Sequence, residues 1–227
     1  MKLVHHKIET RFFFDPENQV FELVIENKPF FSSVVKSVVV QQQGDEVEGG
    51  FILSDDEKIS ILDFEQNAEV IIDPFNLDSN KREFIGKITK QLIFCAQNAE
   101  NLSKTIELEA RLNVFAAELI SELNGSYEIT PNISAESIIK AFSVSIESEV
   151  SSLGSLINYL SLSKELGGKK LIFMIGLRNY LSDKETEEII KEFKYRGINV
   201  LLVENNCYTA VEGLKRVIID KDMCEIS

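Results

Sequence analysis

The chain has 227 residues, of which 44% are hydrophobic, and a formal net charge of -13. This hydrophobic fraction is sufficient for a buried core, which excludes a disordered or fibrous protein. A surface with this average charge repels DNA and anionic membranes, so the composition alone disfavours a nucleic-acid-binding protein. The length suits one large domain or one domain with a sizeable insertion.

The cysteine pattern and the termini favour a protein of a reducing compartment. Cys95, Cys207 and Cys224 lie far apart and form no C-x-x-C pattern, which disfavours a zinc site or a disulfide framework. The N-terminal segment has no long apolar run and no small-residue cleavage site. The longest apolar stretch, LIFMIGL, is too short to span a bilayer. We therefore expect a soluble, cytoplasmic protein.

The first 26 residues predict β-strands. The aromatic run at residues 12–14 leads into the turn sequence DPEN, and the β-branched and aromatic residues of QVFELVIE follow it. The pattern then becomes helical, because apolar residues recur at helical spacing from Phe30 to Val38 and Pro29 suits a first helical turn. Two short strands, FILS and EVIIDP, are expected after the break at QQQGDEVEGG.

Most of the negative charge is concentrated in one segment. Residues 45–73 contain ten acidic residues and one lysine, which gives -9 of the total -13. The simplest interpretation, and the one we prefer, is a set of solvated loops around two short strands.

Residues 79–124 have a different pattern, with no proline and a single glycine. Apolar residues recur in steps of three and four, first at Ile85, Ile88, Leu92, Cys95, Ala99, Leu102 and Ile106, and then in a shifted phase at Leu112, Phe115, Leu119 and Leu123. A single helix of this extent would be roughly 70 Å long. The pattern therefore favours an extended helical projection, or two helices bent near residues 98–101, and its apolar stripe predicts self-association.

The remaining residues alternate between strands and helices. Strands are expected at YEIT, LIFMIG, NVLLVE and RVIIDKDMCEI, and helices after Ser134, over residues 147–166, and after Ser182, which forms a capping box with Glu185. This alternation predicts a mostly parallel sheet. The chain is thus expected to form an α/β head from residues 1–77 and 125–227, with a helical leg inserted over residues 78–124.

The expected strand–loop–helix at VFELVIENKPFFSSVVK occupies the place of a phosphate-binding loop. Such a loop needs glycines, so that backbone N–H groups can surround the phosphates, followed by Lys and Ser or Thr. Here the loop from Ile25 to Pro29 has no glycine, and Glu26 would repel phosphate. Nucleotide binding at this loop is therefore disfavoured.

Nucleophilic catalysis has little support in the sequence. His5 and His6 are the only histidines, and as neighbours in a strand they are expected to point to opposite faces. Cys95 falls on the apolar stripe, where a core position is the simplest interpretation.

Four glutamates are candidates for binding a hard divalent cation such as calcium, which prefers several carboxylate oxygens. They are Glu118, Glu122, Glu147 and Glu149. They could converge only if the two helices that carry them meet. Taken alone, solvated helix faces and acidic residues that complement a helix dipole explain them better.

An ordered set of short motifs resembles one known family. The motifs are IENKPFF, IDPFNLD and DKDMCEI, with KLIFMIGLRNYLSDKETEEIIKEF and INVLLVEN between the last two. Together they are similar to the DNA-end-binding spacer-acquisition (adaptation) protein of type II-A CRISPR systems, and the resemblance covers nearly the whole chain.

The resemblance implies a head similar to P-loop ATPases, with a degenerate phosphate loop and an inserted extended α-helical leg. It implies a homotetrameric ring that binds the ends of double-stranded DNA through a basic central hole, calcium ions that order the ring, and no catalytic activity. The implied role is the acquisition of new spacers together with the CRISPR integrase and effector nuclease.

The resemblance also suggests site residues. The family's acidic cluster corresponds to Glu147 and Glu149, although Ser148 interrupts the run here, and Glu118 and Glu122 are added as calcium ligands because they are near in the chain. The DNA-binding candidates are Lys28 in the degenerate loop and Lys81, Arg82, Lys87 and Lys90 at the base of the leg. Contacts to the DNA backbone would make binding independent of sequence and strongly dependent on salt.

Two alternatives remain open. One is a nucleotide hydrolase with an atypical phosphate site, and the other is a pure protein scaffold of the adaptation complex. The charge distribution is compatible with a DNA-binding ring, because residues 81–90 contain four basic residues and one acidic residue, or +3. A ring could collect these residues inside and turn the acidic segment outward.

Overall fold

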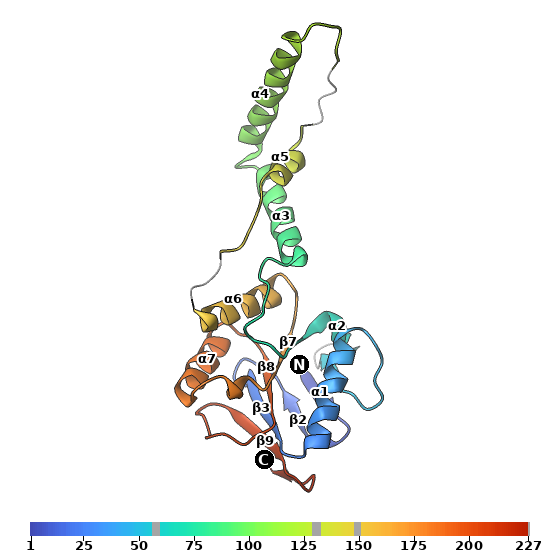
Figure 1. Cartoon of the computed structure of the whole chain (residues 1–227), viewed down its shortest axis with the longest axis vertical. Coiled ribbons are helices and arrows are strands. Elements are labelled where there is room, and N and C mark those ends of the chain that lie inside the picture. The colour runs from blue at the N-terminus through green and yellow to red at the C-terminus, as the bar shows by residue number, and fades with distance from the viewer. Residues whose placement is uncertain (56–59, 129–132, 148–150, 227) are drawn as a thin grey trace. The chain divides into compact units, whose positions relative to one another are not determined.

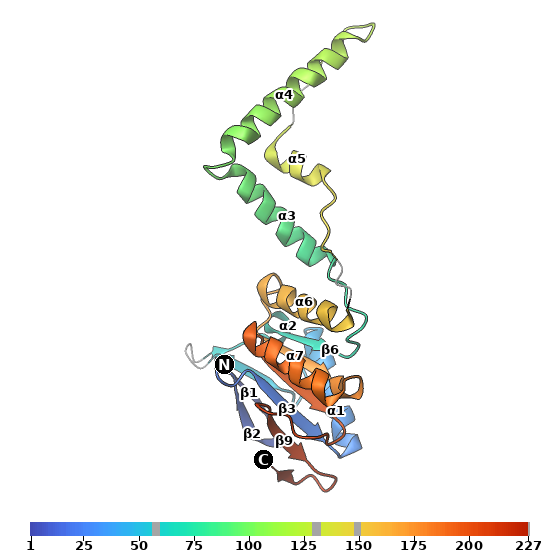
Figure 2. The same ribbon diagram turned by 90° about the vertical axis from the view of Figure 1, so that its left-hand side faces the viewer.

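The computed structural model describes residues 1–55, 60–128, 133–147 and 151–226, and within it the chain forms two compact units. The α/β unit comprises Met1–Ser79 and Ser148–Ser227, and the helical unit comprises Asn80–Glu147. The sequence predicts an insertion over residues 78–124, whereas the helical unit continues to residue 147. The reason is that α5 (Ala135–Ala141) packs against α3 (Arg82–Gln97), as Figures 1 and 2 show.

A six-stranded sheet forms the centre of the α/β unit (Figure 1). Its order is β10-β9-β3-β8-β7-β6, in which β10 is antiparallel to β9 and the other neighbours are parallel. The strands are β3 (Val20–Ile25), β6 (Ala68–Ile71), β7 (Leu171–Ile175), β8 (Val200–Glu204), β9 (Lys215–Ile219) and β10 (Glu225–Ile226). The mostly parallel sheet expected from the alternation of strands and helices is therefore confirmed.

Alternate residues of the central strands serve two apolar layers. Leu23 and Phe173 face the main core, where α1 (Lys28–Gln42) buries Val34 and Val38. On the opposite side of the sheet lie α6 (Ser152–Glu165), α7 (Asp183–Tyr195) and the short 3-10 helix η1 (Leu177–Asn179). The side chain of Ser182 and that of Glu185 cap α7 reciprocally, as the sequence predicts.

A second sheet of four antiparallel strands lies beside the main core, in the order β2-β1-β4-β5. Its strands are β1 (Lys2–His5), β2 (Ile8–Phe13), β4 (Ile52–Asp55) and β5 (Ser60–Ile61), and the short helix α2 (Phe64–Asn67) follows. Leu3 and Leu53 point into the core, while Ile52 and Ile61 are exposed on the outer face. The Glu225 carboxylate accepts the backbone N–H of Glu9 at 2.6 Å, so the C-terminal hairpin also holds this sheet.

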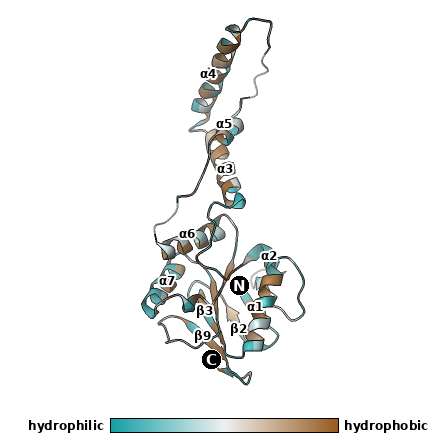
Figure 3. Ribbon diagram, in the orientation of Figure 1, coloured by the Kyte–Doolittle hydropathy of each residue, from teal (hydrophilic) through white to brown (hydrophobic). Residues whose placement is uncertain are grey.

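The helical unit contains two successive helices, α3 and α4 (Leu102–Ser121), which is one of the two arrangements that the apolar pattern predicts. The Asn98 side chain accepts the backbone N–H groups of Glu100 (3.1 Å) and Asn101 (3.0 Å) and so ends α3. No residue of α4 is buried, although hydrophobic residues run along it (Figure 3). Its exposed apolar residues are Leu102, Ile106, Leu108, Val114, Phe115 and Leu119.

Three local predictions are corrected. Tyr127 and Glu128, expected to begin the strand YEIT, lie in irregular structure, and the rest of that segment is outside the described residues. The helix expected over residues 147–166 begins only at Ser152. RVIIDKDMCEI forms two strands rather than one, because the Asp220 side chain accepts the backbone N–H of Cys224 (2.8 Å) and closes a turn between β9 and β10.

No helix in the described part of the chain is long and apolar enough to cross a membrane.

Candidate nucleic-acid interface

The first turns of α3 carry a basic face. Arg82, Lys87 and Lys90 are exposed, and Lys81, the residue before the helix, is half-buried. Lys87 and Lys90 are three residues apart and therefore neighbours on the helix surface, whereas Ile88 is half-buried on the other side. The four predicted DNA contacts of the leg thus lie within one short stretch of the helical unit. We call them the α3 basic face.

Two local interactions orient this face. The Lys87 ammonium lies 3.2 Å from the Glu83 carboxylate, and the Lys81 ammonium lies 4.1 Å from the centroid of the Phe84 ring, which is fully buried. An exposed ion pair four residues apart contributes only about 0.3–0.5 kcal/mol. Glu83 therefore competes weakly with any phosphate that approaches Lys87.

Lys28 lies in the α/β unit, as the exposed first residue of α1. Only Glu26 and Asn27 separate it from β3. The Asn27 side chain accepts the backbone N–H of Phe30 at 3.0 Å and donates to the carbonyl of Lys221 at 2.9 Å. The start of α1 is therefore capped by the chain itself, without the glycine-rich cradle that phosphates need.

The predicted calcium ligands are spread over several segments. Glu118 lies in α4 and Glu122 directly after it, and both are exposed, as is Glu147 at the end of the helical unit. Glu149 lies outside the described residues. Among the residues that the structure describes, no three His, Cys, Asp or Glu side chains lie close enough to hold a metal ion. The calcium site stays a prediction.

Two predictions about other reactive side chains are corrected. His6 lies in the turn after β1 rather than in the strand, so its ring is near that of His5, with centroids 4.8 Å apart. Burial, together with the positive charges of His6 and Lys7, lowers the pKa of His5 to about 4. Cys95 is exposed rather than part of a core.

A buried charged cluster, which the sequence analysis missed, lies on the α7 side of the sheet. Glu22 is completely buried in the central strand β3, and its carboxylate pairs with Arg178 at 2.9 Å and with Arg216. Arg178 also pairs with Asp183 at 3.0 Å and donates to the carbonyl of Thr209 at 3.0 Å. The cluster therefore ties β3, η1, the start of α7 and the segment before β9 to one carboxylate.

Glu204, at the end of β8, lies next to this cluster. One of its oxygens accepts the backbone N–H of Arg178 at 3.0 Å, and the other has no hydrogen-bond partner among the described residues. Burial, with a further contribution from the negative charge of Glu22, raises the pKa of Glu204 to about 7. The sequence does contain one indication of this cluster, since each of the apolar strands VFELVI and NVLLVE includes a glutamate. A charge in a strand that is covered on both faces requires a partner.

A family model described as CRISPR-associated protein (Cas_Csn2) matches residues 43–223. The chain therefore belongs to this family of accessory adaptation proteins of type II-A CRISPR systems. No curated protein matches the chain. A solved structure titled as the dimeric structure of a bacterial ABC transporter cassette has 13% identity and a TM-score of 0.33, over 90% of this chain and 88% of that one.

Titration of Glu204 should make the protein less stable as the pH rises. Its folded pKa of about 7 lies above the ordinary value of 4.5, so the folded state holds more protons between these values. The free energy of unfolding should therefore fall by roughly 3 kcal/mol from this group between pH 4.5 and pH 8. Denaturant unfolding of the wild type and of Glu204→Gln at each pH measures the effect.

The comparison between the two proteins isolates Glu204 from His5, whose lowered pKa acts in the opposite sense. His5 costs stability as the pH falls from 6.5 toward 4, equally in both proteins. Relative to the wild type, Glu204→Gln should become more stable with rising pH, while the exposed control Glu165→Gln should not. Parallel pH curves for Glu204→Gln and the wild type would contradict this role.

Proposed function

We propose that this protein binds the ends of double-stranded DNA without catalysis, as a cytoplasmic homotetrameric ring that acts in spacer acquisition. The α3 basic face is the observation that carries the proposal. It gathers four cations against one carboxylate in a chain whose net charge is -13, and three of the four are exposed. Such a face fits the DNA backbone, because lysine and arginine there would replace the counterions of the phosphates.

The solvent-exposed helix α4 supports the proposal that the protein assembles into a ring. Twenty residues long, it has no buried residue, yet Phe115 is 55% exposed and Ile106 is 56% exposed. Contiguous exposed apolar surface on a folded protein commonly marks an interaction site. A helical unit of this kind would bury its stripe against a second copy and so bring several α3 basic faces into one assembly. The integrase and effector nuclease of the same system are the proposed protein partners.

A nucleotide hydrolase is disfavoured by the loop after β3. That loop has no glycine, its helix is capped by Asn27, and the carboxylates of Glu22 and Glu204 are buried in strands on the same side of the sheet. Without glycine, the backbone of this short loop is not free to close its N–H groups around a phosphate. A purely scaffolding role would use surfaces other than the loop after β3.

Removing two charges of the α3 basic face should weaken DNA binding. We expect Lys87→Gln with Lys90→Gln to reduce the affinity for a linear duplex at least tenfold at 100 mM salt. The slope of log K against log salt should fall by about 2 for each protomer in contact with DNA. Fluorescence anisotropy over a salt series measures both quantities.

The matched control is Lys184→Gln with Lys191→Gln, two exposed lysines of α7 that lie in the other unit. It changes the net charge by the same amount. An equal loss of affinity in the two double variants would show that only bulk charge matters and would contradict the assignment of the α3 basic face.

Calcium is proposed to order the assembly through the carboxylates of Glu147 and Glu149. Removal of calcium with a chelator should lower the melting temperature and the assembly mass, and Glu147→Ala with Glu149→Ala should reproduce both changes in the presence of calcium. Glu165→Ala, which changes an exposed glutamate at the end of α6, serves as the control. An unchanged melting curve and mass in excess chelator would refute the site.

A further inference from the structure

A groove with a volume of about 1170 Å³ lies on the outer face of the small sheet in the α/β unit. Its floor includes Val4 of β1, Ile52 of β4 and Ile61 of β5. Its rim comes from the loop after α1 and from the start of α2, with the acidic side chains Asp45, Glu46, Glu48, Asp63 and Glu65. We call this surface the acidic groove. None of its residues belongs to the α3 basic face or to the predicted calcium site.

The acidic groove combines an apolar floor with a negative rim. Ile52 is 48% exposed and Ile61 is 78% exposed, so the floor presents hydrophobic side chains to solvent. Six carboxylates line the groove, namely the five of the rim and that of Glu9. The permanent cations in the lining are Lys2 and Arg11, so the net charge of the groove is -4. Within the described residues, none of the six carboxylates forms an ion pair, so no cation neutralises their charge, although Asp63 also accepts the backbone N–H of Gln66 at 2.8 Å as the cap of α2.

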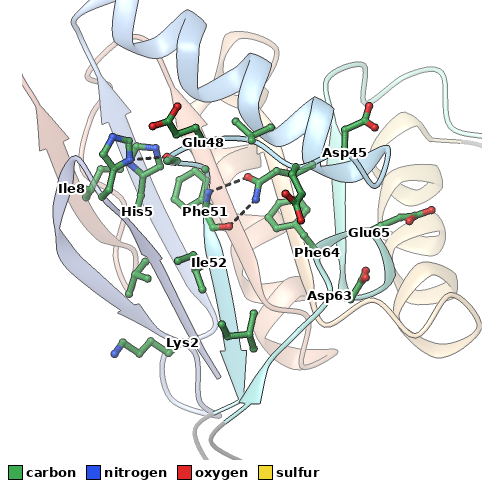
Figure 4. A pocket seen from close by; sticks show the side chains of 18 of the residues that line it. Lys2, His5, Ile8, Asp45, Glu48, Phe51, Ile52, Asp63, Phe64 and Glu65 are labelled. Carbon is green, nitrogen blue, oxygen red and sulfur yellow. Dashed lines mark hydrogen bonds between the residues drawn. The ribbon is translucent and has the colours of Figure 1, made fainter.

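The rim loop is held in place by the protein itself. The Gln41 amide donates to the carbonyl of Phe51 at 2.7 Å and accepts its backbone N–H at 3.0 Å, and the His6 ring lies 2.6 Å from the carbonyl oxygen of Gly49 (Figure 4). Gly49 has a φ of 71°, and a Cβ there would lie 2.3 Å from the His6 ring, so the loop can approach His6 only with glycine at this position. A groove fixed in this way loses little entropy when a ligand binds.

Figure 4 shows how the lining residues are arranged around β4. Ile52 lies between His5 and Ile8 on one side and Phe64 and Asp63 on the other. Asp45 and Glu48 project from the rim loop. The labelled carboxylates are thus spread along the edge of the groove and do not meet at one point.

We infer that the acidic groove is a docking surface for a basic segment of a partner protein, one that alternates lysine or arginine with a large apolar residue. Charge complementarity identifies this class of partner, because the net -4 repels nucleic acid, anionic lipid and the same groove of a second copy. The volume also exceeds the roughly 300–1,000 Å³ of typical small-molecule pockets and suits a peptide segment. The apolar residue would cover Ile52 and Ile61 while the cations meet the rim.

The test uses three labelled peptides that differ in charge or in one apolar residue. They are acetylated and amidated heptapeptides with the sequences KSKLKSK, KSKSKSK and ESELESE, titrated with the full chain in fluorescence anisotropy at 50 mM salt. KSKLKSK should bind at least tenfold more tightly than ESELESE, and about fivefold more tightly than KSKSKSK, because a buried leucine contributes part of the affinity.

Two sets of variants locate the site. Asp45→Asn with Glu46→Gln and Glu48→Gln should weaken KSKLKSK binding at least tenfold. The control Glu17→Gln with Glu187→Gln and Glu212→Gln changes the charge equally at exposed positions outside the groove and should leave binding nearly unchanged. Ile61→Ser should reduce the affinity for KSKLKSK to that for KSKSKSK, and Tyr195→Ser, at an 86% exposed position on α7, should not.

Three binding results would overturn the inference. They are no measurable binding of KSKLKSK, an equal loss of affinity in the groove and control triple variants, and equal affinities of KSKLKSK and KSKSKSK. A change in the assembly mass caused by Ile61→Ser would also overturn it, because the occupant of the groove would then be a second copy of this chain.

Discussion

The pairing of Glu22 with Arg178 and Arg216 organises the α/β unit. Glu22 is completely buried in the central strand, and the two arginines come from η1 and from β9. Breaking such a buried pair by removing one partner commonly costs about 3–5 kcal/mol, because an uncompensated charge is left inside. These three charged residues come from separate parts of the chain and are brought together by the sheet.

This cluster also bears on what the unit can do. In open α/β sheets, ligands bind outside the carboxyl ends of the strands, where backbone N–H groups of a glycine-rich turn meet the phosphates. Here the chain passes from β3 to α1 through two residues, Asn27 occupies the helix start, and Glu204 ends the neighbouring strand. The charged surfaces proposed to bind partners lie elsewhere, on α3 and around the acidic groove.

The sequence predicts those features that depend on neighbours in the chain. The capping of α7 by Ser182 and Glu185 and the break near Asn98 both follow from short-range rules of hydrogen bonding and backbone conformation. The buried strands are equally predictable from the sequence, because continuous apolar runs fit a sheet covered on both faces.

Features that depend on distant residues could not be predicted in the same way. Glu22 and Arg216 are 194 positions apart, and nothing local distinguishes Arg216 from a surface arginine. The nearness of His5 and His6 depends on where β1 ends, since one residue of difference changes the direction of a side chain. From the sequence, the acidic segment is interpreted as solvated loops. That some of its residues form the rim of a groove could not be predicted, because the groove also requires β1, β4 and α2, which only the fold brings beside them.

The most direct test of the proposed function compares duplexes with and without ends. A linear duplex and a covalently closed circular duplex of the same sequence and length would be titrated with the protein in the presence of calcium, in fluorescence anisotropy at 100 mM salt. End binding through a ring predicts an affinity at least tenfold higher for the linear duplex, because a closed circle cannot thread a closed ring. Equal affinities, or no binding to either duplex, would contradict it.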